Sequence, residues 1–385
     1  MESTSKIVIT CPPRINVHLA KEVEHLGFKV HKTDRMGVQI IGTFNDAMKL
    51  NLHLRTGSKV LYQIHSFKAV HPDDLYKAVK KFPWEEYIKS DGYVSIQSYV
   101  KNDFIRDTKF ANLRVKDGIA DRYMEKFDRR PDSGPDSSQT VIFLHWQLDN
   151  CNIYIDTSGE TIAKHNYRKI PFKAPMLEAL ASATILASDW DKKSSFINPM
   201  CGSGTLAIEA ALMAIEKPPG LMRENFGFMH IVGYNYLYWE KIVKQAQENV
   251  IEVDRLPFDI IASDLSPEAL SAARTNARNA GVEHLITFEK CDFRDTLIPD
   301  DGGVVFLNPE YGERLGDEKE LEGVYTEIGD FFKKRCSGHK GYVFTGNLNL
   351  AKKIGLKAKR RVEFYNGKID ARLLEYELYS GSKRT

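Results

Sequence analysis

The chain has 385 residues, of which 42% are hydrophobic and 28% charged, and its formal net charge is +2. This length exceeds what one hydrophobic core usually serves, so we expect two or three globular domains. No apolar run approaches the roughly 18 residues of a membrane span, and no early stretch resembles a signal peptide, so we expect a cytoplasmic protein. The 5 cysteines form no Cys-x-x-Cys pair, which argues against a disulfide framework or a zinc site and predicts reduced thiols.

The first half of the chain predicts α+β elements. Residues 7–10 and 14–26 are expected as a strand and a helix, followed by two short strands around Met36-Gly37 and a helix capped by Asn45 or Asp46. The next expected elements are strand 60–64, helix 73–81, strand 93–100, an amphipathic helix 110–127, and strands 141–148 and 152–155. Residues 129–138 are rich in Pro, Ser, Gly and Asp, which predicts an exposed, mobile loop.

From about Ala174 helices and strands alternate, which is typical of a doubly wound parallel sheet. The expected elements are helix 175–187, strand 194–197, helix 206–215, strand 259–263, helix 267–280, strands 286–289 and 303–307, helix 321–334 and strand 341–345. Residues 217–256 look like an insertion, and two long strands flank Asn366-Gly367, a type I′ hairpin signal. A parallel sheet closed by an antiparallel hairpin is the layout of Rossmann-like methyltransferases.

Two loops follow predicted strands and should meet at the carboxyl edge of the sheet, where open α/β sheets bind ligands. The first is Asn198-Pro199-Met200-Cys201-Gly202-Ser203-Gly204-Thr205. Gly202 and Gly204 let the backbone approach a ligand, and the helix that starts near Thr205 offers N–H groups to a carboxylate such as that of S-adenosylmethionine. A Gly-x-Gly turn is weak by itself, but Asp264 ends the next sheet strand, where it can accept ribose hydroxyls. Asp292 follows a third strand and is placed to accept from an adenine amino group, with Phe293 packing on the ring.

The second loop is Asn308-Pro309-Glu310-Tyr311. The lone pair of an aromatic amine such as the guanine N2 group is delocalised, so the amine is a poor nucleophile. The Asn308 side-chain carbonyl and the Pro309 backbone carbonyl could bind its two N–H bonds and aim the nitrogen at a methyl sulfonium. Tyr311 would stack on the base, a contact worth about 1 to 3 kcal/mol, which offsets the cost of extruding a nucleotide.

Basic residues gather in two stretches, and local charge matters more than net charge for a nucleic-acid surface. The first holds Lys101, Arg106, Lys109, Arg114, Lys116, Arg122, Lys126, Arg129 and Arg130. The second holds Lys352, Lys353, Lys357, Lys359, Arg360 and Arg361. Ordinary solvated faces are an equally good interpretation of these stretches taken alone.

Several motifs together resemble the THUMP-domain methyltransferases, and within them the RlmL type, over nearly the whole chain. The motifs are Leu54-Arg55-Thr56, Lys59-Val60-Leu61, residues 113–117 and 156–159, Tyr167-Arg168, Ala174-Pro175, residues 198–205 and residues 308–315. The resemblance implies a ferredoxin-like domain at 1–55, an RNA-binding THUMP domain at 56–163 and an S-adenosylmethionine-dependent class I methyltransferase domain at 164–385.

The residues and the resemblance together give the following site predictions. We predict catalytic roles for Asn308, Pro309 and Tyr311. The predicted cofactor-binding residues are Asn198, Pro199, Cys201, Gly202, Ser203, Gly204, Thr205, Asp264, Leu265, Asp292, Phe293 and Asn308. The predicted RNA-binding residues are Lys109, Arg114, Lys116, Arg122 and Arg168. No metal is expected.

The sequence departs from the family pattern at two places. The third residue of the second loop is commonly Pro and is Glu310 here, while the Pro309 carbonyl is retained. Glu310 is either a simple loop substitution or an acceptor for guanine N1–H. Only the Tyr167-Arg168 end of the usual His-Lys-Arg-Gly-Tyr-Arg motif is present at residues 163–168.

The resemblance favours methylation of guanine N2 in 23S ribosomal RNA, free or in a pre-ribosomal particle, by a monomer or weak dimer that binds no membrane. Guanine-N2 methylation of tRNA, adenine-N6 methylation of DNA and a non-catalytic RNA-binding assembly factor stay open as alternatives. No metal-like spacing is formed by His18, His25, His65, His71 and His145, so we expect surface or core roles for them. Cys201 has no histidine partner in sequence, so we expect it to be a small packed residue. The aromatic residues at 226–239 are expected to pack the insertion.

Overall fold

A computed structural model describes residues 3–105, 107–170, 175–311 and 318–379. Arg106, Ala174 and residues 312–315, which belong to the predictions above, lie outside these ranges. The chain divides into two compact units. Unit 1 comprises Met1–Cys11, Leu19–Ile162 and Arg223–Ala246, and unit 2 comprises Pro12–His18, Ala163–Met222 and Gln247–Thr385. Within the described ranges, no helix combines the length and the apolar character needed to cross a bilayer.

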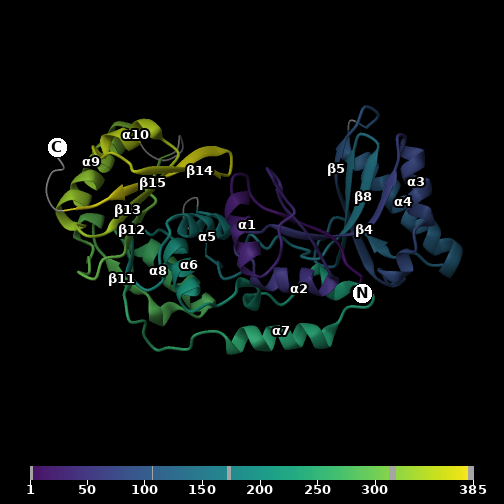
Figure 1. The fold of residues 1–385 in the computed structure, drawn as a ribbon, viewed down its shortest axis with the longest axis horizontal. Helices are drawn as coiled ribbons and strands as arrows, with labels where there is room; N and C mark the ends of the chain where they lie inside the picture. Colours follow the sequence, from purple (N-terminus) through teal and green to yellow (C-terminus); the bar gives the residue numbers. More distant parts are fainter. Residues whose placement is uncertain (1–2, 106, 171–174, 312–317, 380–385) are drawn as a thin grey trace. The chain divides into compact units, whose positions relative to one another are not determined.

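Unit 1 is built on one eight-stranded sheet with the order β2-β3-β1-β4-β8-β7-β5-β6. Figure 1 labels β4, β5 and β8 of this sheet. Its strands are β1 (Ser5–Thr10), β2 (Lys32–Asp34), β3 (Gly37–Gly42), β4 (Lys59–Lys68), β5 (Tyr93–Lys101), β6 (Asp132–Ser133), β7 (Thr140–Gln147) and β8 (Asn150–Asp156). The helices of this part of the chain are α1 (Asn16–His25), α2 (Phe44–His53), α3 (Pro72–Lys81) and α4 (Thr108–Phe127). Because β1 pairs with β4 and β4 with β8, one continuous sheet runs through both predicted N-terminal domains.

Two local predictions in unit 1 are corrected. Helix α2 is capped by Thr43, not by Asn45 or Asp46: the Thr43 hydroxyl accepts the Asp46 N–H at 3.2 Å, and the Asp46 carboxylate accepts the Thr43 N–H at 2.7 Å. This reciprocal capping box satisfies two helix-end donors, so the helix starts earlier than predicted. In the predicted loop 129–138, Asp132–Ser133 form β6 beside β5, and Pro131 is buried.

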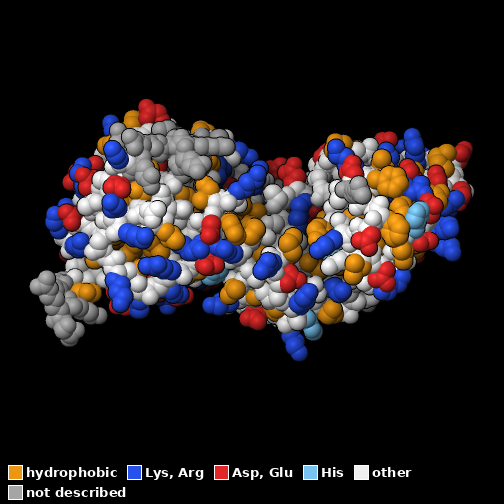
Figure 2. Space-filling view, turned by 90° about the horizontal axis from the view of Figure 1, so that it is seen from above, with side chains coloured by type: hydrophobic (Ala, Val, Ile, Leu, Met, Phe, Trp, Pro, Cys, Tyr) orange, Lys and Arg blue, Asp and Glu red, His pale blue; other side chains and the backbone are white. Residues whose placement is uncertain are grey.

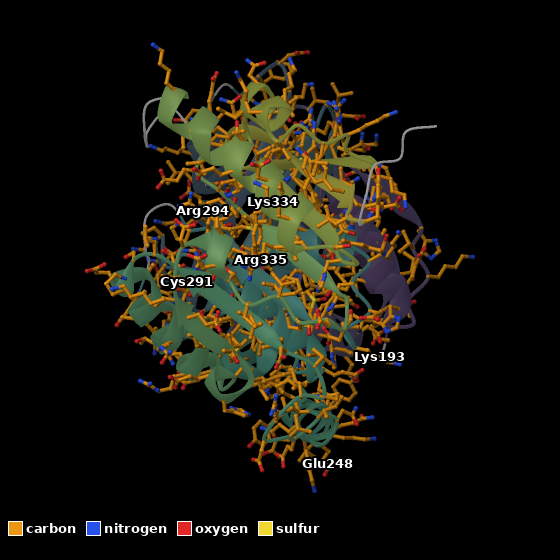
Figure 3. The ribbon with its side chains drawn as sticks, turned by 90° about the vertical axis from the view of Figure 1, so that its left-hand side faces the viewer. Lys193, Glu248, Cys291, Arg294, Lys334 and Arg335 are labelled. Atoms are coloured by element: carbon orange, nitrogen blue, oxygen red, sulfur yellow. The ribbon has the colours of Figure 1, made fainter. Side chains whose placement is uncertain are left out.

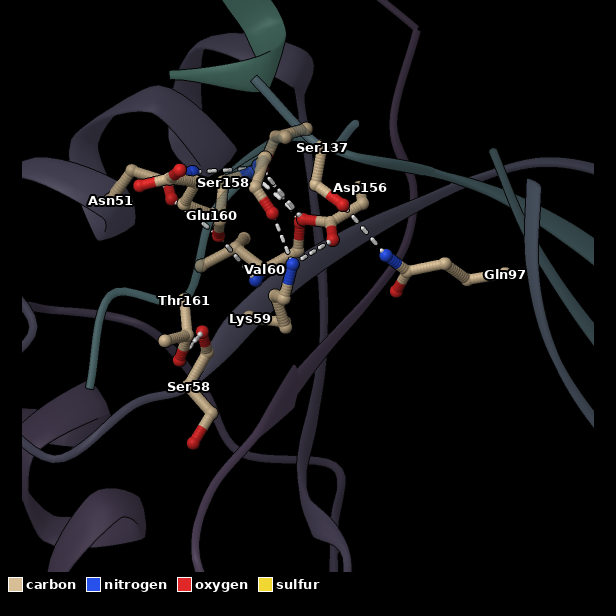
Figure 4. A network of polar contacts seen from close by, with 12 residues as sticks. Asn51, Ser58, Lys59, Val60, Gln97, Ser137, Asp156, Ser158, Glu160 and Thr161 are labelled. Atoms are coloured by element: carbon tan, nitrogen blue, oxygen red, sulfur yellow. Dashed lines mark hydrogen bonds and ion pairs between the residues drawn. The ribbon is translucent and has the colours of Figure 1, made fainter. Parts of the chain in front are cut away.

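A buried polar network joins α2 to strand β4 and to the turn after β8 (Figure 4). Asn51 is 1% exposed, and its amide donates to Ala47 O at 2.9 Å and to the Thr157 hydroxyl at 2.8 Å. The Asn51 carbonyl accepts from the Ser158 hydroxyl at 2.6 Å. Beside it, Lys59 pairs at 2.7 Å with Asp156, which is 1% exposed. These buried groups are satisfied by one another, as buried polar groups in folded proteins usually are.

Unit 2 contains a seven-stranded sheet with the order β11-β10-β9-β12-β13-β15-β14. The strands are β9 (Phe196–Pro199), β10 (Ile260–Asp264), β11 (Thr287–Lys290), β12 (Val304–Leu307), β13 (Lys340–Thr345), β14 (Arg360–Asn366) and β15 (Ile369–Glu377). The strands from β11 to β13 are parallel, and β15 runs antiparallel to β13 and β14. The predicted Rossmann-like layout of a parallel sheet closed by an antiparallel hairpin is therefore confirmed.

Helices cover both faces of the unit 2 sheet, as Figure 1 shows for α6 and α8 on one side and α9 and α10 on the other. They are α5 (Glu178–Ala187), α6 (Thr205–Ala214), α8 (Pro267–Ala280), α9 (Glu318–Arg335) and α10 (Leu348–Lys353). Ile197, Val305 and Leu307 of the sheet pack with Tyr325 and Ile328 of α9 in one buried cluster. This packing fixes the carboxyl ends of β9 and β12, from which the two predicted site loops emerge.

The turn between β14 and β15 differs by one residue from the prediction. Asn366 pairs with Ile369, so the two loop residues are Gly367 and Lys368 rather than Asn366 and Gly367. Gly367 has φ +60°, whereas Lys368 is not among the described residues with positive φ. This is the pattern of a type II′ turn, because a type I′ turn needs positive φ at both positions. Asn366 therefore belongs to the strand.

The predicted insertion contains helix α7 (Tyr236–Glu248), and its residues Arg223–Ala246 belong to unit 1. The backbone of Phe228 donates to Thr157 O at 3.0 Å, beside the end of β8. Phe226 and Phe228 are fully buried and both lie against Trp239, with ring centroids 5.3 and 4.9 Å apart. The predicted packing role is confirmed for these three residues, whereas Tyr236 is 55% exposed.

Candidate active site

The two predicted loops of unit 2 line one cleft of about 840 Å³ at the carboxyl ends of the parallel strands. A cleft of this size is typical of small-molecule sites. It is bordered by most of the predicted cofactor-binding residues: Asn198, Cys201, Gly202, Ser203, Thr205, Asp264, Leu265, Asp292, Phe293 and Asn308. Pro309 and Glu310 line it as well, whereas Pro199 and Gly204 do not. The loops are about a hundred residues apart in sequence, so the fold alone brings them together.

The two glycines of the first loop serve different purposes. Both have positive φ, +56° at Gly202 and +79° at Gly204. A Cβ on Gly204 would lie 2.9 Å from the Cβ of Ala273 in α8, so this glycine permits close packing of helices α6 and α8. A Cβ on Gly202 would meet nothing within 4 Å. Because Gly202 lines the cleft, its backbone is the one that a ligand could approach closely.

Asp264 ends β10 and braces the first loop. One carboxylate oxygen accepts the Gly202 N–H at 2.9 Å, and the other accepts the Ser266 N–H at 2.9 Å. A carboxylate has about four acceptor sites, so each oxygen can still accept a hydroxyl from the cleft. Asp264 can thus shape the loop and contact a ribose at the same time.

Asp292 forms an ion pair with Arg294 that the sequence did not predict. The Arg294 guanidinium binds both carboxylate oxygens, with distances of 2.8 and 2.9 Å, and also reaches Glu327 at 3.1 Å (Arg294 is labelled in Figure 3). The hydrogen bonds from Arg294 lower the pKa of Asp292 and keep it ionised. The Phe293 ring packs against Phe331 at 5.8 Å. Asp292 borders the cleft as predicted, but its charge is already balanced.

Two asparagine oxygens at the cleft have no hydrogen-bond partner in the part of the chain that the structure describes. Asn198 is 1% exposed, and its amide donates to Phe306 O at 2.8 Å. Among the residues that the structure describes, neither Asn198 Oδ1 nor Asn308 Oδ1 has a partner, although both atoms are buried. An unsatisfied buried acceptor costs roughly 1 to 3 kcal/mol, so such atoms mark a place for a ligand donor. Asn308 Oδ1 is the acceptor that the sequence predicts for an amino group.

Tyr311 does not line the cleft. Its ring lies against Gly346 and edge-on to Phe344, and its hydroxyl accepts from the Asn366 amide at 2.8 Å. Stacking of Tyr311 on a base stays a prediction. Glu310 is exposed and is one of the residues that line the cleft, and its backbone carbonyl accepts from the Tyr325 hydroxyl at 3.4 Å.

The predicted RNA-binding residues fall into two classes. Lys109 is exposed and Lys116 half-buried on α4, where Phe110 and Leu113 are also exposed. Arg114 instead pairs with Asp73, and Arg122 binds both oxygens of Glu85 at 2.7 and 2.8 Å. Basic and acidic side chains intermingle on the face shown in Figure 2.

Arg168 is mostly enclosed in unit 2. It donates to the Thr205 hydroxyl at 2.9 Å and to Met176 O, and lies 3.5 Å from Glu178. Its side chain is 12% exposed. Through these contacts Arg168 stabilises the structure beside the first loop. Its contact with RNA stays a prediction that the geometry does not favour.

A buried cluster around Glu209 escaped sequence reasoning. Its carboxylate accepts from the Tyr167 hydroxyl at 2.8 Å and the Ser182 hydroxyl at 2.7 Å, and lies 2.7 Å from His165 Nδ1. All four residues are buried. The only sequence signal was a lone glutamate in the otherwise apolar helix α6. The cluster connects residues 165–167 to helices α5 and α6 of unit 2.

Two further site chemistries find no support in the described residues. Burial raises the pKa of the Cys201 thiol above its usual range, which disfavours the nucleophilic thiolate form. No group of three His, Cys, Asp or Glu side chains in the described ranges could hold a metal ion.

Comparison with known proteins identifies three successive regions. The RlmL ferredoxin-like domain matches residues 6–61, the THUMP domain matches residues 70–156, and the RMKL-like methyltransferase domain matches residues 165–375. These matches confirm the family resemblance and the fold class.

Relatives are similar over almost the whole chain. "Ribosomal RNA large subunit methyltransferase K/L" of Syntrophotalea carbinolica is 35% identical over 98% of this chain and 54% of its own length. "Putative RNA methyltransferase slr0064" of Synechocystis is 32% identical over 94% of this chain and 93% of its own length. The chain thus spans about half the length of the K/L relatives. The crystal structure of SMU.472 complexed with SAH has a TM-score of 0.87 and 27% identity over 100% of both chains. This chain belongs to the RMKL-like methyltransferase family.

Proposed function

We propose that this protein methylates the exocyclic N2 amino group of a guanine in 23S ribosomal RNA, with S-adenosylmethionine as the methyl donor. The observation that carries the proposal is the buried Asn308 Oδ1, which has no hydrogen-bond partner among the described residues and belongs to a residue that borders the same cleft as the first loop. The proposed domains are a ferredoxin-like domain at 1–55, a THUMP domain at 56–163 and a methyltransferase domain at 164–385.

The residues of the cleft fit S-adenosylmethionine. The open backbone at Gly202 and the start of α6 suit the methionyl carboxylate, and Asp264 suits the ribose hydroxyls. Related support comes from SMU.472, whose structure holds SAH. When bound, the cofactor supplies an electrophilic methyl group on a positively charged sulfur. Asp292 contributes less than the sequence predicts, because Arg294 already holds its carboxylate.

The second loop would act by positioning. The N–H bonds of the guanine amino group donate to Asn308 Oδ1 and to the Pro309 carbonyl, which turns the nitrogen lone pair toward the methyl group. Both acceptors are neutral, so they orient the amine and leave its proton to depart to water after transfer. No covalent enzyme intermediate is needed.

The RNA part of the proposal rests on the THUMP match and on the relatives' names. The exposed Lys109 and the partly exposed Lys116, interleaved with the exposed Phe110 and Leu113, suit a phosphate backbone with unpaired bases. Binding should therefore weaken steeply as salt increases.

The proposal is tested by incubating the protein with labelled S-adenosylmethionine and total RNA from cells that lack the protein, and in a parallel reaction with added DNA, followed by mapping of the modified base. We expect label at a guanine N2 in 23S ribosomal RNA. Label confined to tRNA would refute the ribosomal assignment, and label at adenine N6 of added DNA would refute the guanine assignment. Cofactor binding without any transfer, or no cofactor binding, would favour a non-catalytic RNA-binding factor.

A further inference from the structure

The loop that carries the proposed amine clamp is held in place by residues from the end of the sheet. Asn308 and Pro309 line the cleft, whereas the partly exposed Tyr311, two residues further on, is not one of its lining residues. Its hydroxyl accepts a hydrogen bond of 2.8 Å from Asn366 Nδ2, at the tip of the β14–β15 hairpin. This bond joins positions 55 residues apart in the chain.

Gly346 leaves room for the Tyr311 ring. A Cβ built on Gly346 would lie 2.7 and 2.8 Å from two ring carbons of Tyr311, and 2.5 Å from Ile369 Cγ2. Real Cβ atoms essentially never approach other atoms so closely, so any larger residue would displace the ring. Phe344 meets the same ring edge-on, with centroids 6.1 Å apart and an angle of 69° between the ring planes. The ring is thus enclosed by a strand end and held by a hydrogen bond, and it remains partly exposed.

The hairpin tip is itself fixed. Arg14 pairs with Asp370 and lies 3.5 Å from Glu363, and its guanidinium lies 4.3 Å from the centre of the Tyr365 ring. Arg14 has φ +66°, an uncommon conformation for a residue other than glycine. Tyr365 directly precedes Asn366, so the contacts of Arg14 restrain the backbone that presents the Asn366 amide.

A second bond holds the loop at Glu310, the residue before Tyr311. The Tyr325 hydroxyl of α9 reaches the Glu310 carbonyl at 3.4 Å and the Thr345 hydroxyl at 2.8 Å. Thr345 directly precedes Gly346. The loop is therefore braced on both sides of the Glu310–Tyr311 peptide by residues that gather at the end of β13.

We propose that Asn366 and Gly346 are positioning residues that set the orientation of the Tyr311 ring relative to the amine clamp, so that the target base meets the ring and Asn308 together. The inference rests on the proposed function, because it assigns Tyr311 to the target base. It predicts that displacing the ring slows methyl transfer without weakening cofactor binding, since the first loop and Asp264 are separate from the brace.

The test compares Asn366→Ala, Asn366→Asp and Gly346→Ala with the wild-type protein on total RNA from cells that lack it. Asn366→Ala should lower kcat about 10-fold, and Gly346→Ala should lower it about 100-fold, as expected for misplacement of a reacting group by about 1 Å. The cofactor Kd should stay near wild type in all three variants. The melting temperature should stay near wild type in the Asn366 variants, whereas the close contacts of the new Cβ in Gly346→Ala should lower it. Asn366→Asp should recover most of kcat, because a carboxylate can accept the Tyr311 hydroxyl. Gly323→Ala is the matched control, since a Cβ there meets nothing within 4 Å.

A double-mutant cycle with Tyr311→Phe isolates the contribution of the hydrogen bond between Asn366 and Tyr311. Asn366→Ala should have no further effect once the Tyr311 hydroxyl is absent. In protein labelled with 3-fluorotyrosine, Asn366→Ala and Gly346→Ala should shift the ¹⁹F resonance that Tyr311→Phe removes, and Gly323→Ala should not.

The inference is overturned if Asn366→Ala is as active as wild type, or if Asn366→Ala lowers kcat by the same factor in the Tyr311→Phe background. It is also overturned if Asn366→Ala weakens cofactor binding as much as it lowers kcat and Asn366→Asp restores neither. Label in tRNA alone would refute the ribosomal proposal. The same variants would then be compared with tRNA as the substrate, which still tests the positioning role. No transfer to any RNA would refute both.

Discussion

Asn51 of unit 1 and Asn308 of unit 2 differ in how their side-chain carbonyls are satisfied, and this difference separates a structural role from a binding role. Asn51 in unit 1 uses its amide and its carbonyl for three hydrogen bonds to Ala47, Thr157 and Ser158. Asn308 in unit 2 keeps a buried Oδ1 that no described residue satisfies. A folded protein seldom tolerates such an atom without a reason, so a satisfied network indicates a structural role and an orphaned acceptor indicates a binding role.

The largest expected effect is the loss of activity when Asn308 is replaced. Asn308→Ala should lower kcat at least about 1,000-fold, comparable to removing an electrostatic stabiliser worth about 4 kcal/mol. The melting temperature should not fall, because the Oδ1 has no partner to lose among the described residues. Single-turnover methyl transfer and thermal unfolding measure the two quantities. A variant that loses stability and keeps its activity would reverse our interpretation of the two asparagines.

Asn51→Ala should have the opposite effect. Removal of its three hydrogen bonds leaves the buried Thr157 and Ser158 hydroxyls short of partners, and should lower the free energy of unfolding by about 2 to 4 kcal/mol. Urea unfolding monitored by circular dichroism measures the loss. Methyl transfer per folded molecule should match wild type, and a large fall in kcat would contradict a purely structural role.

The two cleft aspartates extend the comparison to cofactor binding. Asp264→Ala should raise the Kd for S-adenosylmethionine about 30- to 100-fold, because the loop loses its brace at Gly202 and the cofactor loses an acceptor. Asp292→Ala should raise it less than about 5-fold, since Arg294 already balances that carboxylate. Isothermal titration calorimetry compares the two variants, and equal effects would show that Asp292 contacts the cofactor despite Arg294.

The smallest expected effect is on how the stability of unit 1 depends on pH. Burial lowers the pKa of His53 to about 4, so the folded state keeps this ring neutral. An unfolded histidine takes up its proton near pH 6.5, so stability is fully present above that pH and is lost as the pH falls from about 6.5 to about 4. The loss should amount to about 2 kcal/mol or less. His53→Gln should flatten the pH dependence of urea unfolding in this range, and an unchanged profile would exclude His53 as its source.

Local patterns predicted most of the elements correctly. Helix α8 (Pro267–Ala280) has the predicted bounds, since Ser266 caps it and Gly281 ends it. The site loops were found because apolar runs mark the strands that precede them. The errors lie where a distant partner decides. Asn366 joins the strand rather than the turn, and its amide holds Tyr311. The RNA contact of Arg168 stays a prediction, because its guanidinium already donates to the distant Thr205 hydroxyl.

The sequence alone determined the alternation of helices and strands, the two loops at the strand ends and the candidate side chains on them, because periodicity and turn chemistry act over a few residues. Only the tertiary structure decided which atoms are free to bind. Asn308 Oδ1 is without a described partner, the Asp292 carboxylate is held by Arg294, and Tyr311 is enclosed by Gly346 and Asn366. Hydrogen-bond satisfaction depends on every neighbour in space, and those neighbours come from segments that the chain order keeps far apart.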